Sequence, residues 1–182
     1  NYYSGSANTK FSVVRYGNVM GSRGSVIPLF LSMSHKNELP ITDLRMTRFM
    51  ISLEDAVNFI WHAFENMMGG EIYIKKIPSM KVTDIALAVN PNAKLKEVGI
   101  RPGEKLHEQM IGAEDALNTY EYQDYFKVLP SRNNWSNDPE RIGKGNKVNP
   151  NFIYRSDTNK EWMKVIELQN WINANREIIG II

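Results

Sequence analysis

The sequence contains no cysteine. Disulfide bonds, thiolate nucleophiles and cysteine-based metal sites are therefore excluded, and the composition fits a reducing compartment. Long apolar runs are also lacking: residues 26–31 form one of the longest, whereas a membrane span needs roughly 18–20 residues. An excess of one sign of charge is lacking as well, because 22 Lys and Arg against 20 Asp and Glu leave a net charge of only +2. Nucleic-acid and membrane-surface binders concentrate basic residues on one face, so this balance argues against both.

The 182 residues suffice for one domain, or for one domain with an appendage. With 42% hydrophobic residues, the chain can form a substantial core. The sequence opens at Asn1 without a methionine and soon enters an apolar, β-branched stretch. We therefore expect a piece of a longer protein, in which case the lack of a leader says little about targeting.

Strand-like and helix-like patterns alternate along the chain, which indicates the α/β class. We expect strands over residues 11–16, 71–77 and 94–98, a short extended stretch over 38–43, and helices over 26–36, 52–68, 84–89 and 162–172. Residues 133–150 are rich in Asn, Gly, Ser and Lys and are expected to form a long loop. Three or four strands are few for a complete doubly wound sheet.

The clearest predicted helix begins at Ser52, where Asp55 three residues later resembles a capping box. Four apolar side chains recur at helical spacing on one face, which is expected to pack on the core: Val57, Ile60, Trp61 and Phe64. The glycine pair 69–70 is expected to end this helix. Thr83 is expected to cap the short helix over residues 84–89.

A glycine-rich loop over residues 17–25 joins an expected strand to an expected helix. Its backbone N–H groups can face an anion, and ligands of α/β sheets lie at the carboxyl ends of strands. Within the loop, Asn18 can donate and accept hydrogen bonds, and Arg23 can pair with a phosphate. The glycine spacing matches neither G-x-G-x-x-G nor a P-loop, so an ordinary connection between strand and helix is the alternative.

Two arginines outside the loop are candidates for binding a diphosphate, because a guanidinium makes paired hydrogen bonds to phosphate oxygens. Arg48 precedes the capped helix, and Arg101 opens a turn that contains Glu104. The alternative for each arginine is exposure to solvent or a salt bridge to Asp43, Glu54 or Glu104. Glu104 itself can accept from a ribose hydroxyl or can cap its own turn.

The sequence shows no catalytic or metal-binding constellation. The three histidines, His35, His62 and His107, lack the spacing of metal ligands, and there is no G-x-S-x-G motif. His62 is expected to be a surface or hydrogen-bonded side chain, whereas for His107, which lies in a polar turn, both that role and the role of a ligand are open. The aromatic cluster at residues 120–126 is expected to be a packing or interface feature rather than a platform for stacked bases, because few cations interleave with it.

Four ordered blocks, over residues 11–30, 39–49, 69–84 and 99–108, resemble the inverting UDP-N-acetylglucosamine 4,6-dehydratases. The first block contains Arg-Tyr-Gly-Asn-Val-Met-Gly-Ser-Arg-Gly-Ser (15–25), and the last contains Arg-Pro-Gly-Glu-Lys-Leu-His-Glu (101–108). The family belongs to the extended short-chain dehydrogenase/reductases. Its most similar members act in the pathway to pseudaminic acid, which decorates flagellin and other bacterial surface glycans.

The resemblance implies an α/β fold that corresponds to the C-terminal part of an extended Rossmann-type, NAD(P)-binding protein. Residues 1–25 would end the Rossmann domain with a late strand and a loop at the cofactor's edge. Residues 26–182 would form mainly the UDP-sugar-binding domain, with a loop-rich extension from about residue 113. The family's dinucleotide fingerprint and its Thr-Asp-Lys and Tyr-x-x-x-Lys motifs do not occur in this sequence and are expected before Asn1.

The implied activity is an NADP-dependent 4,6-dehydration of UDP-N-acetylglucosamine. The cofactor takes hydride from C4, water leaves across C5 and C6, and the hydride returns to C6 with inversion at C5, giving a UDP-4-keto-6-deoxy-hexose. The implied partners are this substrate, NADP(H) and the missing N-terminal Rossmann portion. The resemblance further implies a homo-oligomer in the bacterial cytoplasm, with no nucleic acid, membrane or metal.

Single residues receive roles from the same resemblance. Asn18, Arg48, Arg101 and Glu104 match positions that bind the UDP-sugar, with Arg48 beside the diphosphate and the last two at phosphate and ribose. The border of the NADP(H) site is matched by Tyr16, Val19, Met20, Gly21, Ser22 and Arg23. No catalytic residue is expected in this chain, because every proton-transfer residue belongs to the absent motifs.

Two other functions remain open at this point. A non-catalytic UDP-sugar-binding module would keep the arginines without the chemistry. A sibling enzyme, such as a UDP-sugar 4-epimerase or a capsule-pathway dehydratase, would share the substrate-binding residues and form a different product.

Overall fold

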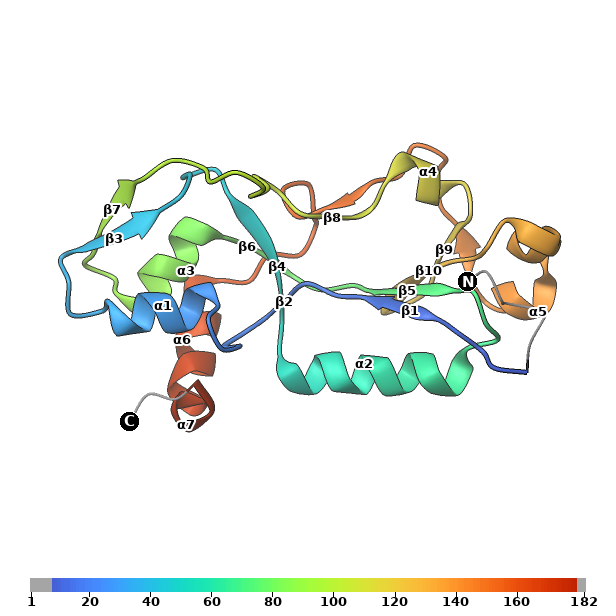
Figure 1. The fold of residues 1–182 in the computed structure, drawn as a ribbon, viewed down its shortest axis with the longest axis horizontal. Coiled ribbons are helices and arrows are strands. Elements are labelled where there is room, and N and C mark those ends of the chain that lie inside the picture. Colours follow the sequence, from blue (N-terminus) through green and yellow to red (C-terminus); the bar gives the residue numbers. More distant parts are fainter. Residues whose placement is uncertain (1–7, 180–182) are drawn as a thin grey trace. The chain divides into compact units, whose positions relative to one another are not determined.

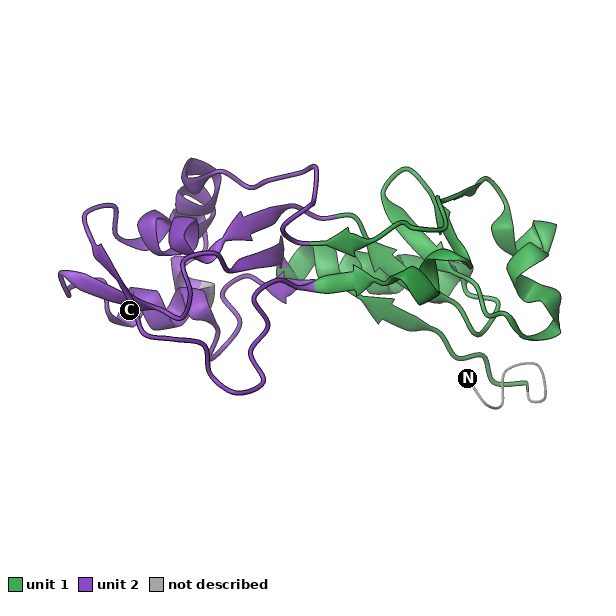
Figure 2. Ribbon diagram, turned by 90° about the horizontal axis from the view of Figure 1, so that it is seen from above, with its two compact units in different colours: residues 1–16, 53–76, 109–155 green, residues 17–52, 77–108, 156–182 purple. Residues whose placement is uncertain are grey.

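The computed structural model describes residues 8–179, which form two compact units (Figure 2). Among the described residues, unit 1 comprises residues 8–16, Leu53–Lys76 and Gln109–Arg155, and unit 2 comprises Gly17–Ser52, Ile77–Glu108 and residues 156–179. The units interleave along the sequence, so two later segments share a unit with the first predicted strand. Residues 1–7 of the expected 1–25 segment lie outside the described residues. The assignment of residues 1–25 to a cofactor domain and 26–182 to a sugar domain stays a prediction.

Within the described residues, unit 1 combines a five-stranded sheet and a separate two-stranded sheet with one long helix and several short ones (Figure 1). Its strands are β1 (Val13–Arg15), β5 (Ile72–Lys75), β8 (Gln109–Ile111), β9 (Thr119–Glu121), β10 (Tyr125–Val128), β11 (Asn146–Lys147) and β12 (Tyr154–Arg155). Its helices are α2 (Leu53–Asn66), α4 (Ala113–Ala116), the 3-10 helix η1 (Arg132–Asn137) and α5 (Pro139–Ile142). The main sheet has the order β1-β5-β10-β9-β11, with β1 parallel to β5 and the other pairs antiparallel.

The described part of unit 2 contains two small sheets and four helices. Its strands are β2 (Asn18–Val19), β3 (Glu38–Ile41), β4 (Thr47–Ile51), β6 (Ser79–Lys81) and β7 (Lys94–Glu97). Its helices are α1 (Val26–Ser32), α3 (Val82–Val89), α6 (Val165–Ala174) and α7 (Arg176–Ile179). One sheet has the order β2-β4-β6 and the other pairs β3 with β7, and the pairs β2–β4 and β3–β7 are parallel. The parallel pairs and interspersed helices confirm the predicted α/β class.

The core of unit 2 forms where α1, α3 and α6 bury their apolar faces together. Fully buried side chains from these helices and from β3 meet there, namely Ile27, Phe30, Leu39, Ile41, Ile85 and Leu168. Fully burying one such side chain stabilises the fold by about 1.5–3 kcal/mol. This core fixes α1 and β3, two elements that also line the cavity described below.

Helix α2 has the predicted position, but the predicted core-facing side is wrong. Ala56, Phe59 and Ala63 are its buried residues, and Phe59 packs with Ala63 on Tyr73 of β5. Among the four residues expected in the core, Trp61 is 59% exposed and Phe64 is 61% exposed. The buried side of this helix and the exposed side that carries Trp61 and Phe64 both contain apolar residues. Helical spacing alone therefore could not decide which side faces the sheet.

Three local predictions are also corrected. Thr83 lies inside α3, which begins at Val82 and has Lys81 at its N-cap. The region 133–150, expected to be a loop, contains most of η1 together with α5 and β11. Strands are also more numerous than the three or four expected, since twelve occur in residues 8–179.

A buried ion pair joins part of that region to the sheet of unit 1. The guanidinium of Arg141 donates to Glu71 Oε1 at 2.9 Å, and the two side chains are 7% and 1% exposed. Glu71 also accepts hydrogen bonds from the backbone N–H groups of Met68 and Gly69 and from the hydroxyl of Ser12. The carboxylate is therefore well supplied with donors, as burial of a charge requires.

No helix within residues 8–179 combines the length and the apolarity that a membrane crossing needs.

Candidate functional site

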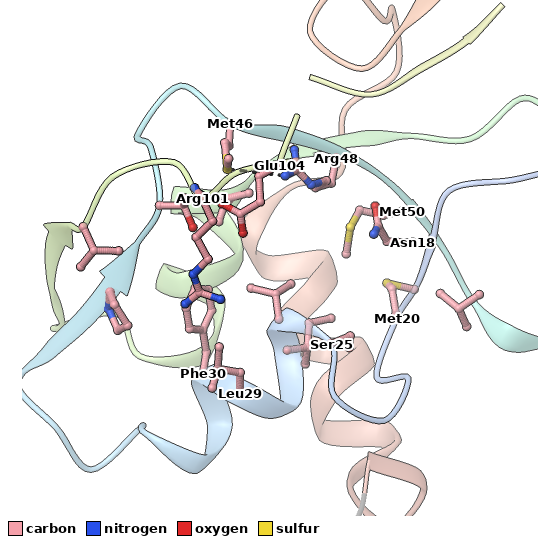
Figure 3. Close-up of a pocket in the computed structure, with 17 residues that line it drawn as sticks. Asn18, Met20, Ser25, Leu29, Phe30, Met46, Arg48, Met50, Arg101 and Glu104 are labelled. Carbon is pink, nitrogen blue, oxygen red and sulfur yellow. Dashed lines mark hydrogen bonds between the residues drawn. The ribbon is translucent and has the colours of Figure 1, made fainter. Parts of the chain in front are cut away.

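A cavity of about 250 Å³ opens in unit 2 and gathers the four predicted sugar-nucleotide residues (Figure 3). Asn18, Arg48, Arg101 and Glu104 all line it. They come from β2, from β4 and from the loop after β7, which are far apart in sequence. The remaining lining is largely apolar and includes Leu29 and Phe30 of α1. A mostly apolar pocket with a few converging polar groups is typical of small-molecule sites.

Asn18 lies on β2, which pairs with β4 at the cavity. The two strands are parallel, with Asn18 opposite Met50. A Cβ atom on Gly17 would lie 2.5 Å from both the Cβ and the carbonyl oxygen of Phe49. The first glycine of the loop is therefore required by strand packing.

The Asn18 amide has one orientation that suits its neighbours. Its Nδ2 then donates to Oε1 and Oε2 of Glu108, both at 3.1 Å, and to the carbonyl oxygen of Phe49 at 3.3 Å. The reverse orientation would point the amide oxygen at these three acceptors. Asn18 is nevertheless exposed, so part of its amide remains available to a ligand.

Arg48 is held largely by groups of the protein. Its Nη1 donates to the carbonyl oxygens of Thr47 at 2.8 Å and Leu106 at 3.2 Å, and its Nε lies 3.7 Å from Glu108 Oε1. Its ion-pair partner is thus Glu108. Asp43, one of the partners considered from the sequence, pairs instead with Arg45 at 2.7 Å, and the hydrogen bonds from Arg45 lower the pKa of Asp43 to about 2.

Arg101 and Glu104 are exposed and belong to one turn. The backbone N–H of Arg101 donates to Glu104 Oε2 at 3.0 Å, so Glu104 caps its own turn. Figure 3 shows the Arg101 side chain extending from this turn toward α1, where Leu29 and Phe30 lie. Its guanidinium is therefore presented to the same cavity as Asn18 and Arg48.

The six residues predicted at the cofactor's edge lie in different surroundings. Val19 and Met20 line the cavity, and Met20 is also part of the core of unit 2. Ser22 and Arg23 are exposed in the loop after β2 and offer a hydroxyl and a guanidinium, donors that fit the phosphates of a dinucleotide. Gly21 has a φ of +71°, and a Cβ there would lie 2.9 Å from the Trp171 ring. Tyr16 is exposed and belongs to unit 1.

Sequence reasoning missed a polar network beside the cavity. His107 Nδ1 lies 2.9 Å from Thr47 Oγ1, which lies 2.7 Å from Ser156 Oγ, and His107 Nε2 lies 3.8 Å from Asp157. Glu108 follows directly and adds a carboxylate against Asn18. The only sequence signal for both residues was their place at the end of the 99–108 block.

Within residues 8–179, no group of three or more His, Asp or Glu side chains is arranged to hold a metal ion. His62, predicted to be a surface or hydrogen-bonded side chain, stacks on Phe59 and meets Tyr125 edge-on, and its Nε2 is buried without a hydrogen-bond partner.

Comparison with known proteins adds to this geometry. The profile of a family described as "Polysaccharide biosynthesis protein" matches residues 1–130. The chain is 51% identical over 180 residues to a UDP-N-acetylglucosamine 4,6-dehydratase (inverting) of Campylobacter jejuni, which covers 95% of this chain and 54% of that protein. It is 40% identical over 125 residues to a UDP-glucose 4-epimerase of Rickettsia canadensis, covering 66% of this chain and 37% of that protein.

A solved structure, described as the X-ray structure of Pen from Bacillus thuringiensis, is similar with a TM-score of 0.77 and 33% identity. The likeness covers 96% of this chain and 53% of that chain, and it confirms the predicted α/β fold. The chain spans about half the length of the Campylobacter relative and of the Bacillus protein.

Proposed function

Because the chain belongs to the family of polysaccharide biosynthesis proteins, we propose that it supplies the sugar-nucleotide-binding part of a UDP-N-acetylglucosamine 4,6-dehydratase that inverts C5. One observation carries this proposal. The four residues expected to bind a UDP-sugar come from three separate segments and line one cavity. That the similar Campylobacter protein bears this name supports the choice of substrate and reaction.

The two arginines can bind the diphosphate in different ways. Both Nη groups and the Nε of Arg48 are engaged with the protein, since Nη2 donates to the Sδ of Met46 at 3.5 Å, so Arg48 supplies a fixed positive charge at the cavity wall. Arg101 is exposed and can bring its guanidinium fork to the phosphate oxygens. A fixed charge beside an exposed guanidinium fork suits a ligand that carries two adjacent phosphates. Asn18 would then face the sugar.

A nicotinamide cofactor is expected beside this site, and we propose NADP(H). When bound, the cofactor supplies the hydride chemistry. The residues of this chain would border it through the exposed Ser22 and Arg23 and through Val19 and Met20 at the cavity. Their task is to bind and orient, because the Thr-Asp-Lys and Tyr-x-x-x-Lys motifs do not occur in the sequence.

We propose that the remaining Rossmann polypeptide of the intact enzyme supplies those motifs. Two features of unit 1 support this partner. Within the described residues β1 is an edge strand, and its parallel pairing with β5 is typical of sheets that are covered on both faces. Beside it, α2 exposes Trp61 and Phe64, an apolar surface suited to a neighbouring helix. Assembly into a homo-oligomer stays a prediction.

Product analysis tests the proposed function. We expect the intact protein, incubated with UDP-N-acetylglucosamine and NADP, to give a product whose proton NMR spectrum shows a C6 methyl group in place of the C6 hydroxymethyl. A 4-epimer that keeps its C6 hydroxyl would assign the chain to the sibling epimerases. Binding of UDP-N-acetylglucosamine without any conversion would assign it to the non-catalytic modules.

Replacing Arg101 tests the binding role separately. We expect Arg101→Ala to weaken binding of UDP-N-acetylglucosamine by about 1.5–3 kcal/mol, or roughly 10- to 150-fold, because charged hydrogen bonds to the diphosphate are lost. Isothermal titration of the intact protein measures this. Arg176→Ala is the matched control, since it removes the same charge from an exposed position on α7. Equal affinities of the Arg101 variant and the unaltered protein would contradict the assignment.

A further inference from the structure

Glu108 connects two of the cavity residues, although neither the motifs nor the predicted roles singled it out. Its carboxylate is 30% exposed. It accepts from Asn18 Nδ2 at 3.1 Å through each oxygen and from the backbone N–H of Phe49, and it lies 3.7 Å from Arg48 Nε. One carboxylate therefore meets both the amide and the guanidinium that line the cavity.

The backbone around Glu108 is fixed on both sides. Its N–H donates to Ser156 Oγ at 2.9 Å, and its carbonyl oxygen accepts from the N–H of Ser156 at 2.8 Å. Two residues earlier, Leu106 accepts from the N–H of Thr47 at 3.1 Å. These bonds tie the backbone of the 106–108 segment to β4 and to Ser156, and the contacts of the carboxylate with Asn18, Arg48 and the Phe49 N–H hold its end in place.

A fixed carboxylate imposes a direction on the amide next to it. The two ends of an asparagine amide have nearly the same shape, but one end only donates and the other only accepts hydrogen bonds. An ionised carboxylate only accepts, so it selects the NH₂ end of Asn18. The amide oxygen is left as the end that a ligand can use.

We propose that Glu108 is a positioning residue that orients the Asn18 amide so that its oxygen accepts a hydrogen bond from the bound sugar nucleotide. This inference rests on the proposed function for its ligand, and the orientation itself concerns the ligand-free protein. The chemical group recognised is a donor, namely a sugar hydroxyl or an amide N–H. Arg48, held by the same carboxylate, lines the same cavity.

The ionisation of Glu108 controls this orientation. Burial raises the pKa of the Glu108 carboxyl, while Arg48, the Phe49 N–H and Lys105 oppose that rise. Once protonated, the carboxyl becomes a donor and no longer selects the NH₂ end of the amide. Affinity for the sugar nucleotide is therefore expected to fall as the pH drops through the raised pKa of this carboxyl.

A double-variant cycle in the intact protein tests the positioning role. We expect Asn18→Ala and Glu108→Gln each to weaken binding of UDP-N-acetylglucosamine about 5- to 10-fold. If Glu108 acts through Asn18, the double variant binds as weakly as Asn18→Ala alone. Losses that multiply would overturn the proposal. Glu161→Gln, at an exposed position of unit 2, is the matched control and should bind normally.

The pH dependence gives a readout that a merely structural residue would not move. UDP-N-acetylglucosamine is the suitable ligand, because its diphosphate is esterified at both ends and does not titrate in this range. We expect its affinity to fall at low pH in the unaltered protein and in Glu161→Gln. Glu108→Gln should lack that fall, and a fall of the same size in this variant would overturn the proposal.

A measurement without ligand separates this inference from the proposed function. The side-chain NH₂ signals of Asn18 in a nitrogen-15 NMR spectrum, assigned by their loss in Asn18→Ala, are expected to shift with pH as Glu108 titrates. Signals that stay unchanged from neutral pH down through the carboxyl range would overturn the orientation, even if the sugar nucleotide binds. A clear titration would support it even if the substrate is a different molecule, or if Glu108→Gln fails to fold.

Discussion

We expect Glu71→Ala to lower the free energy of unfolding by about 3–5 kcal/mol, a large fraction of the stability of an ordinary domain. The substitution leaves the guanidinium of Arg141 buried at 7% exposure without its carboxylate. It also removes the acceptor for the N–H groups of Met68 and Gly69, which turn the chain between α2 and β5. Denaturant unfolding of the intact protein measures the loss.

Two further variants identify the cause of that loss. Glu140→Ala removes a carboxylate from an exposed position of the neighbouring α5 and should change stability by no more than about 0.5 kcal/mol. Replacing both Glu71 and Arg141 by apolar residues should recover part of the loss, because no buried charge is then left unpaired. A cost below about 1 kcal/mol for Glu71→Ala would show that the buried carboxylate is not needed.

The same ion pair helps to order the region 133–150, which the sequence alone predicted to be a loop. The sequence of this region shows neither helical nor strand periodicity of its apolar residues. Asn133 and Asn134 have φ values of +54° and +56°, which no sequence pattern predicts. What orders the region comes from distant residues: Arg141 contacts Glu71 and lies 3.9 Å from the centroid of the Trp135 ring. Tertiary contacts of this kind cannot be read from local propensity.

Elements with strong local signals were predicted well. The helix at 52–68 has acidic residues in its first turn and a glycine pair beyond its end, and it occurs as α2 (Leu53–Asn66). Its orientation was predicted wrongly because the helix has apolar residues on both sides: Ala56 and Phe59 are buried, whereas Trp61 and Phe64 are exposed. Periodicity places an element on the chain, whereas its buried side depends on what the element meets in space.

The candidate site, too, was predictable only where the sequence carries a local signal. Arg48 and Arg101 could be nominated from their residue type and motif, and the fold brings both to one cavity. Glu108 could not be nominated, because a carboxylate at the end of a polar turn has no distinctive spacing. Its role depends on the Asn18 amide, which lies 90 residues earlier in the sequence and meets it only in the folded protein.

The glycine-rich loop leads to a further expected result: Gly17→Ala should destabilise the intact protein by about 3 kcal/mol, at the upper end of the cost of overpacking. The new Cβ would lie 2.5 Å from the Phe49 Cβ and carbonyl oxygen and 2.7 Å from its carbonyl carbon. Two of these three atoms are backbone, which cannot move aside as a flexible side chain can. The strands β2 and β4 must therefore separate.

Gly24→Ala, in the same loop, distinguishes this steric cause from the ordinary cost of losing a glycine. Gly24 has a φ of +76° but open space around its Cβ position, so alanine there should cost only about 1–2 kcal/mol of backbone strain. Separation of β2 from β4 also displaces Asn18 from the Phe49 carbonyl oxygen and from Glu108. We therefore expect Gly17→Ala to weaken sugar-nucleotide binding and Gly24→Ala to preserve it, as measured by titration calorimetry. Equal effects of the two substitutions on stability and on binding would show that the close approach of these strands does not position the site.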